Sequence, residues 1–427
     1  MFRRFFRRNS PPRFSYQRLI AEIATALPAF PGRWILFCDH PLDRSDRLRL
    51  KPGDRVATGG KLVPFIDSPA YVIAPATGVI TAIEPFLGDF GRRLTRIDLR
   101  TDGPETIDPG FTEAAAEVSI ETLRAWAGDL PGGLDPTALT PPDQPIETLL
   151  VSAVEADLLS VSAQYVLKTR TDAVRQGIEI LRQVTGAKRV ILAVGRESFQ
   201  GLGGHLHAEI RAVSGIYPAS APALMVKELL GRQVPAGAPL AKLGLAVVSV
   251  EAAASLGRSF AEKRLALEKI VTVVDRDGRR SLVTVRVGTP VAEIFEALGI
   301  RLGAGDRLIA GGPMAGACLF TDDHPVRPDT HCLLVQDPAA VTHCSSDPCI
   351  NCGECVRICP THVPINMLVR LLETGKYDIA ADEYDLWSCV DCGLCSYVCP
   401  ARIPIFQYIR LAKHELALRQ VAETENV

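Results

Sequence analysis

The sequence predicts a multidomain protein of α/β plus β class that ends in a helical domain. Three observations support this prediction: short β-type runs separated by turn residues fill 48–84, strands alternate with an amphipathic helix from Thr148 onward, and a cysteine-rich segment repeats near the C-terminus. The chain has 427 residues, which is enough for roughly two to four domains with cores of their own.

The composition is that of an ordinary water-soluble globular protein, with 22% charged residues and a net charge of −2. This balance argues against a nucleic-acid-binding protein, which would carry a basic excess. We find no run of about twenty apolar residues that would cross a bilayer, and no apolar core of a secretory signal, so we expect a cytoplasmic protein. The Arg- and Phe-rich residues 1–8 fit either a frayed terminus or a tether to a membrane surface or partner subunit.

The first predicted domain is a small β structure. Its pattern V-x-x-G-x-x-L at Val56–Leu62 and A-P-x-x-G-x-I at Ala74–Ile80 resembles the barrel-sandwich of biotinyl and lipoyl carriers. No lysine stands in the hairpin between the halves, where a carrier would be modified. We therefore expect a structural or docking module.

Alternating strands and helices follow. Residues 148–154 and 189–195 are typical of buried strands, 171–186 of an amphipathic helix closed by Gly186, and 245–257 of a strand that runs into a helix. This alternation predicts a parallel α/β layer. The Pro- and Gly-rich segment 129–145 before it is expected to be a loop.

A second β-rich unit follows the α/β layer. Two β runs flank the turn at Asp275–Arg280, a helix is expected to begin near Pro290, and the glycine-rich stretch 310–319 precedes a final strand. The arrangement resembles a β-grasp. The glycines fit tight turns better than a phosphate cradle, because the strand–GxGxxG–helix context is missing.

The C-terminal repeat is the most specific feature of the sequence. Residues 349–372 recur 40 positions later, and each copy has the spacing C-x2-C-x2-C-x3-C-P of bacterial two-cluster ferredoxins. Three closely spaced thiolates grip a four-iron cubane from one side, and in such proteins the fourth cysteine binds the other cluster. The predicted ligands of the first [4Fe–4S] cluster are Cys349, Cys352, Cys355 and Cys399, and those of the second are Cys389, Cys392, Cys395 and Cys359.

Each cysteine run is followed by a helical pattern. The apolar stripe Ile365, Leu368, Val369 and Leu372 has a counterpart in Ile405, Tyr408, Ile409, Ala412 and Leu416, and we expect the two stripes to pack together and shield the clusters. Zinc is the alternative metal, but it favours separated C-x2-C pairs. Because four ligands per cluster are already supplied, Cys318, Cys332 and Cys344 are expected to be buried free thiols.

With these motifs in order, the chain resembles the RnfC subunit of the Rnf electron-transport complex. It is similar more distantly to the NADH- and flavin-binding subunit of respiratory complex I and to cobalamin reductases. The resemblance implies five parts, which are a basic and aromatic extension (1–30), the barrel-sandwich (31–105), a Rossmann-like α/β domain (106–262), an SLBB-like β-grasp (263–336) and a helical ferredoxin-like domain with two clusters (337–427).

The resemblance also implies an FMN site, but its three patterns are altered here. The family's glycine-rich loop keeps only Gly132 and Gly133, its acidic motif keeps Glu155, and a later motif keeps Tyr217 and Pro218. A flavin phosphate needs backbone N–H groups brought close by glycines or a helix N-terminus, and Asp135 would repel it. We expect FMN to be absent unless Gly132, Gly133 and Glu155 still hold it, or the glycines of 195–207 form another loop.

The expected function is that of an iron–sulfur electron-transfer subunit of a membrane-associated, Rnf-like redox complex. It would relay electrons between a soluble partner, such as a ferredoxin, an NADH-linked protein or a cytochrome, and membrane subunits that attach it peripherally to the inner membrane. The alternatives are an FMN-containing NAD(P)H dehydrogenase or a cobalamin-reductase-like flavoenzyme. His205 and His207 alternate as metal ligands on a strand would, but we favour a surface or packing role.

Overall fold

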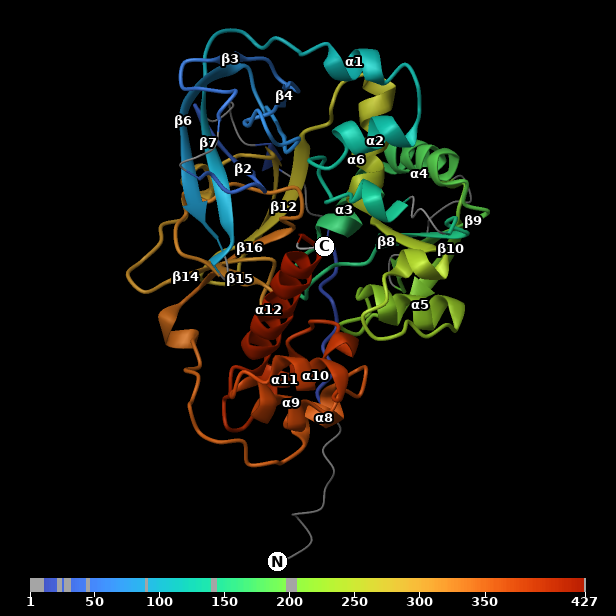
Figure 1. Ribbon diagram of the computed structural model, residues 1–427, viewed down its shortest axis with the longest axis vertical. Helices are drawn as coiled ribbons and strands as arrows, with labels where there is room; N and C mark the ends of the chain where they lie inside the picture. The colour runs from blue at the N-terminus through green and yellow to red at the C-terminus, as the bar shows by residue number, and fades with distance from the viewer. Residues whose placement is uncertain are drawn as a thin grey trace, which may run out of the picture. The chain divides into compact units, whose positions relative to one another are not determined.

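The computed structural model describes residues 11–20, 25–26, 32–43, 47–88, 91–139, 144–196 and 206–425. The chain forms two compact units. The larger unit comprises residues 17–214 and 239–339, and the smaller one comprises 1–16, 215–238 and 340–427. The mixed α/β class is confirmed (Figure 1).

The N-terminal part of the larger unit is built from two small antiparallel sheets. The first has the strand order β2-β7-β6-β3, and the second pairs β4 with β5. These strands are β2 (Arg33–Cys38), β3 (Arg55–Val56), β4 (Lys61–Leu62), β5 (Val72–Ile73), β6 (Gly78–Leu87) and β7 (Arg93–Thr101). Their inward side chains, including Leu36, Ile80 and Ile97, form a core of their own.

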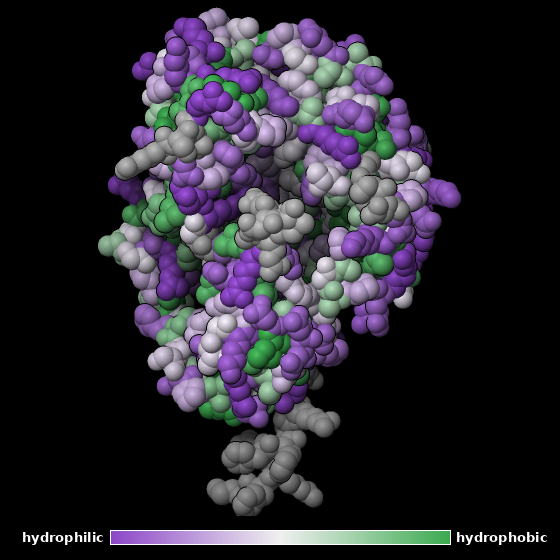
Figure 2. Space-filling model, in the orientation of Figure 1, coloured by the Kyte–Doolittle hydropathy of each residue, from purple (hydrophilic) through white to green (hydrophobic). Residues whose placement is uncertain are grey.

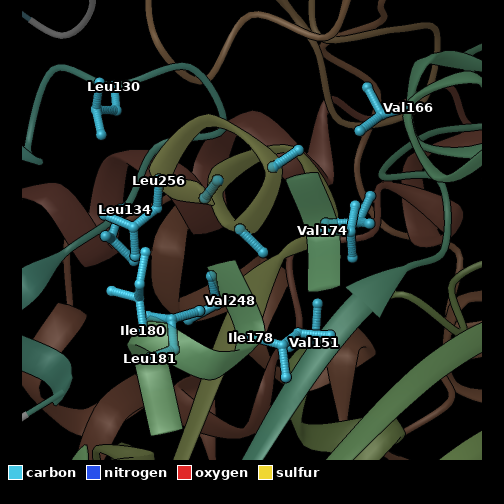
Figure 3. Close-up of a cluster of buried hydrophobic side chains, with 14 of the residues drawn as sticks. Leu130, Leu134, Val151, Val166, Val174, Ile178, Ile180, Leu181, Val248 and Leu256 are labelled. Carbon is cyan, nitrogen blue, oxygen red and sulfur yellow. The ribbon is translucent and has the colours of Figure 1, made fainter. Parts of the chain in front are cut away.

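A four-stranded parallel sheet forms the centre of the larger unit, as the alternating pattern predicts. Its order is β10-β9-β8-β11, with strands β8 (Thr148–Ala153), β9 (Arg189–Gly195), β10 (Glu209–Val213) and β11 (Leu245–Ser249). The helices are α3 (Ser162–Thr169), α4 (Thr171–Thr185) and α6 (Val250–Glu262), and Gly186 closes α4 in the left-handed conformation. Figure 3 shows side chains of these elements, among them Val151, Ile178 and Val248, gathered in one apolar cluster.

Helices α4 and α6 touch through their backbones. A Cβ atom on Gly177 would lie 1.8 Å from the carbonyl oxygen of Ala253, and one on Gly257 would lie 2.0 Å from that of Ala173. Neither approach leaves room for a side chain, so the two glycines set the distance between the helices. This close packing holds the helical layer against the sheet.

A six-stranded mixed sheet completes the larger unit. Its order is β1-β13-β12-β16-β14-β15, and helix α7 (Val291–Leu298) begins directly after Pro290, as expected. The strands are β1 (Thr25–Ala26), β12 (Glu268–Val274), β13 (Arg280–Arg286), β14 (Arg307–Ala310), β15 (Ala317–Leu319) and β16 (Cys332–Gln336).

The smaller unit is mainly helical, and this prediction is confirmed. Its helices are α5 (Pro222–Leu230), α8 (Glu354–Ile358), α9 (Ile365–Leu372), α10 (Tyr377–Asp382), α11 (Leu394–Tyr397) and α12 (Ile405–Glu425). Both predicted apolar stripes enter one core, in which Leu368, Ile409 and Ala412 are fully buried. Helices α8 to α12 lie together in Figure 1.

Residues 88–147 contain more structure than the sequence indicates. Besides β7, the segment forms α1 (Gly110–Ala114), α2 (Ile120–Trp126) and a short 3₁₀ turn at Pro136–Leu139. Ser119 caps α2 by accepting a hydrogen bond from the Thr122 backbone. Further 3₁₀ turns lie at Leu240–Leu243, Pro338–Ala340 and Leu386–Ser388.

Two sequence predictions lie outside the described residues. They are the Arg- and Phe-rich octet at the N-terminus and most of the glycine-containing loop 195–207, including His205. Among the helices that the structure describes, none has the length and apolar character of a membrane span. The face of the molecule in Figure 2 mixes hydrophilic and hydrophobic side chains.

The contact between α4 and α6 gives a stability prediction. We expect Gly177→Ala to lower the free energy of unfolding by about 1–3 kcal/mol, because the new methyl group overpacks the interface. Gly195→Ala is the matched control, since a Cβ there meets nothing within 4 Å. Equal urea midpoints for the two variants, followed by far-UV circular dichroism, would show that the interface relaxes freely.

Candidate metal centre

The two cysteine runs adopt the same backbone conformation. Asn351 and its repeat partner Asp391 both have left-handed φ angles, of 55° and 53°. Gly353 and Gly393 follow at 76° and 71° and begin α8 and α11. Left-handed residues turn the chain sharply, so both loops curl in the same way around their first three cysteines.

Backbone hydrogen bonds repeat with the same spacing of 40 residues. The Cys359 amide donates to the Val356 carbonyl and the Cys399 amide to the Ser396 carbonyl, each at 3.3 Å. The amides of His362 and Arg402 then donate to the carbonyls of the fourth cysteines, Cys359 and Cys399. The internal repeat of the sequence is therefore a structural repeat.

Cys399 lies near the cysteines of the first run. The pKa of the Cys355 thiol is raised to about 11, chiefly by burial and further by the negative charges of Cys352, Cys349 and Cys399. Of these, Cys355 is buried, Cys349 and Cys399 are half-buried, and Cys352 is exposed. The structure thus brings together the four residues predicted for the first cluster.

Cys359 approaches the second run in the same way. Burial raises the pKa of Cys392 to about 11, and the charge of Cys359 contributes to the rise. Burial also raises the pKa of Cys395, where the charges of Cys389 and Cys392 act as well. Each fourth cysteine is therefore close to the run of the other repeat. Metal binding here must displace protons, because thiolates are the ligands.

The spacing of these ligands bears on the kind of metal. Within the described parts of the chain, no three His, Cys, Asp or Glu side chains converge closely enough to hold one metal ion. A tetrahedral zinc site needs such convergence, whereas each thiolate of a four-iron cubane binds a different iron.

Two residues that the sequence reasoning did not select support the second run. Lys413 on α12 donates hydrogen bonds to the Cys389 carbonyl at 2.7 Å and to the Asp391 carboxylate at 2.8 Å. The Tyr217 hydroxyl donates to the Cys392 carbonyl at 2.9 Å, and this bond is buried. Tyr217 was predicted only as a remnant of a flavin motif, and no local pattern links it to a cysteine 175 positions away.

The cysteines outside the two runs differ from one another. Cys332 is fully buried on β16, as expected for a free thiol, and burial raises its pKa to about 12. The prediction of burial is wrong for Cys318 and Cys344, which are exposed. Cys318 lies on a strand at the sheet edge, and Cys344 lies in an extended segment without regular structure, so neither has a covering layer.

The predicted flavin residues Gly132 and Gly133 lie in a loop packed on the start of α6. A Cβ on Gly132 would lie 2.2 Å from the Ala252 nitrogen. The Gly132 carbonyl accepts a hydrogen bond from the Ser249 hydroxyl, and its amide donates to the Pro328 carbonyl. Both backbone groups of Gly132 are therefore used within the chain.

Glu155 and its neighbour Asp157 are buried at the end of β8. Glu155 accepts hydrogen bonds from the amides of Ala163 and Gln164 and so caps α3, while its burial raises its pKa. Asp157 accepts from the amides of Met314 and Ala315 at 3.1 and 2.9 Å and fixes the glycine-rich loop before β15.

His207 has an ordinary surface environment. Its Nδ1 lies 3.2 Å from a carboxylate oxygen of Glu179, and both side chains are about half exposed. This pair fits the surface role that we favoured for His207.

A cavity of about 320 Å³ lies in the larger unit between the N-terminal sheets, the 128–135 loop and the loop after β15. Its wall includes the carboxyls of Asp39, Asp129 and Asp135 and the guanidinium of Arg327. Burial raises the pKa of Asp129 to about 6, although its carboxylate accepts a hydrogen bond from the Ile73 amide.

Two family models match parts of the chain. Residues 136–258 match the Nuo51 FMN-binding domain, and residues 348–403 match a 4Fe–4S dicluster domain. The second match confirms the prediction of a 4Fe–4S domain at the cysteine repeat.

Curated relatives extend the similarity to about three quarters of the chain. It is 25% identical over 340 residues to the RnfC-type subunit of the Na⁺-translocating ferredoxin:NAD⁺ oxidoreductase complex of Acetobacterium woodii, which covers 74% of this chain and 76% of that protein. It is 28% identical over 363 residues to the corresponding subunit of the ion-translocating oxidoreductase complex of Pseudomonas aeruginosa, covering 79% and 47%. The Haemophilus influenzae counterpart is 26% identical, covering 75% and 51%.

The chain therefore spans about half the length of the latter two relatives. The predicted resemblance to the RnfC subunits of Rnf-type complexes is confirmed at this level of identity.

The buried bond of Tyr217 gives the second prediction. Tyr217→Phe leaves the Cys392 carbonyl without this donor, which should lower the free energy of unfolding by about 1–3 kcal/mol. The control is Tyr397→Phe, because the Tyr397 side chain is 61% exposed. Urea unfolding followed by visible absorption of the iron–sulfur protein measures the difference, and identical midpoints would refute it.

Asp129 gives a prediction of pH dependence. Its pKa rises from 3.8 to about 6 on folding, so the folded chain binds this proton more tightly than the unfolded chain. The proton favours folding below about pH 4, and its contribution is lost as the pH rises through about 6. Urea midpoints of Asp129→Asn should therefore increase relative to wild type between about pH 4 and pH 7. Asp135→Asn controls for loss of one charge, and a constant difference would contradict the shift.

Proposed function

We propose that this chain is an iron–sulfur electron-transfer subunit of an ion-translocating oxidoreductase complex and that it carries two [4Fe–4S] clusters. Cys349, Cys352, Cys355 and Cys399 would hold the first cluster, and Cys389, Cys392, Cys395 and Cys359 the second. Each cluster would accept one electron from a reduced partner and pass it to an oxidised one. Its partners would be membrane subunits, which attach it peripherally to the cytoplasmic side of the inner membrane, and a soluble electron carrier.

One observation carries this proposal. The fourth cysteine of each run lies beside the first three cysteines of the other run, as the charge effects of Cys399 on Cys355 and of Cys359 on Cys392 indicate. Interleaved ligation is the arrangement of two-cluster ferredoxins. It brings the clusters close together, which suits transfer between them.

We further propose that the FMN site is lost. A flavin phosphate requires free backbone N–H groups, usually at a helix N-terminus. At α6, the Ser249 hydroxyl already accepts from the Ala252 amide, and Gly132 packs over it. At α3, the Glu155 carboxylate occupies the corresponding amides, and its negative charge would oppose a phosphate.

The crevice that a nucleotide would enter is also used by the chain itself. In the order β10-β9-β8-β11 the connections reverse direction between β8 and β11, and ligands of such sheets bind outside the strand ends at this point. Here the end of β8 is followed by Glu155 and Asp157, whose carboxylates bind α3 and the loop before β15. Gly132, Gly133 and Glu155 therefore do not fit a flavin, and the α/β domain would act as scaffold and docking surface.

The alternative is a flavoenzyme of the NAD(P)H dehydrogenase or cobalamin-reductase kind. The match of residues 136–258 to the Nuo51 FMN-binding domain favours it. Acid extraction of anaerobically purified protein separates the two proposals: we expect iron and sulfide without flavin, and one FMN per chain would overturn the loss of the site. Zinc without iron would overturn both.

Paired substitutions test the ligand assignment. If the clusters interleave, Cys349→Ala with Cys399→Ala removes ligands of one cluster only and should leave about half of the iron. Cys389→Ala with Cys399→Ala then damages both clusters and should leave little. The reverse order of iron contents would show that each run binds its own cluster, and Cys332→Ala is the control that should keep full iron.

A further inference from the structure

The two cysteine loops share a backbone but differ in exposure. In the first loop the Ile350 side chain is 66% exposed and Cys352 is exposed. Their repeat partners in the second loop are Val390, which is half-buried, and Cys392, which is 9% exposed. The sequence repeat itself gives no reason for this difference, because the spacing of the cysteines is the same.

The cover over the second loop comes from distant parts of the same unit. The Tyr217 hydroxyl binds the Cys392 carbonyl, and the ring of Tyr16 meets the ring of Tyr217 edge-on at 5.8 Å. Phe14 packs edge-on against Tyr397 of α11 at 4.9 Å. Segments 11–16 and 215–238 thus lie over the second loop.

The first loop has the composition of a small docking site. Ile350 stands beside the exposed Cys352, and polar groups surround them: Asn351, which accepts a hydrogen bond from Asn366, and the ion pair of Glu354 with Arg357. An apolar centre with a polar rim is typical of protein interfaces. The rim charges are paired, so contact with Ile350 rather than charge attraction would dominate docking.

We propose that electrons enter and leave the cluster pair across the first loop, where a redox protein that carries its cofactor near its own surface docks on Ile350 and Cys352. The second cluster is then the internal member of the pair. The physical reason is that electron transfer slows steeply with distance, and Cys352 is the exposed cluster ligand among the described residues. This inference rests on the proposed function, because it requires both clusters to be present.

The test uses the full-length holoprotein, reduced with dithionite and mixed with an oxidised c-type cytochrome as the probe acceptor. One electron passes from each reduced cluster to one ferric haem, which becomes ferrous as the cluster returns to its oxidised state. Ile350→Asp should slow the second-order rate about ten-fold or more, the effect of losing a central interface contact. The matched control is Tyr397→Asp at the second loop, because Tyr397 is 61% exposed.

Three results are informative. Slow transfer in Ile350→Asp with an unchanged rate in Tyr397→Asp supports the proposal. Slow transfer only in Tyr397→Asp, or equal rates in all three proteins, overturns it. Iron content and dithionite bleaching are measured for each variant, so that a protein without clusters is recognised as a failure of the proposed function and not of the docking site.

Discussion

The packing of α9 against α12 positions the candidate metal centre. Leu368 on α9 and Ile409 and Ala412 on α12 are fully buried in one core, which also contains Cys355 and Cys395. Each helix begins a few residues after its cysteine run, so the helical contact fixes where both loops emerge. Ligands held by packed elements keep their geometry better than ligands on free loops. Burying the repeated apolar stripes and holding eight thiols in place are therefore the same physical event.

The α/β domain illustrates how a binding fold becomes a structural one without losing its sheet. The strands and helices keep the close packing that Gly177 and Gly257 allow. The groups that would face a ligand instead satisfy each other: Glu155 caps a helix, Asp157 fixes a loop, and Ser249 binds Gly132. Buried polar groups with such partners stabilise the fold, and the same bonds leave few donors for a phosphate.

The sequence predicted those features that depend on local spacing. The cysteine runs, the helices after them and the strand–helix alternation from Thr148 are periodic patterns, and the structure confirms these elements. It did not predict the contacts of Tyr217 and Lys413 with the second loop, because a single tyrosine or lysine carries no spacing signal. Helices α1 and α2 were missed for a related reason, since they are too short to show a period within a Pro- and Gly-rich segment. The exposure of Cys318 and Cys344 depends on which strands and segments cover them, and composition does not reveal this.

The assignment of segments to the two compact units has a topological consequence. The chain passes between the units near residues 16, 214, 238 and 339, so the smaller unit is assembled from three separate stretches. A fragment that starts near residue 340 would contain all eight cysteines of the two runs but would lack Phe14, Tyr16 and Tyr217. The metal-binding part is thus interwoven with the rest of the polypeptide rather than appended to it, and cutting any one of these connections would not release it as an intact piece.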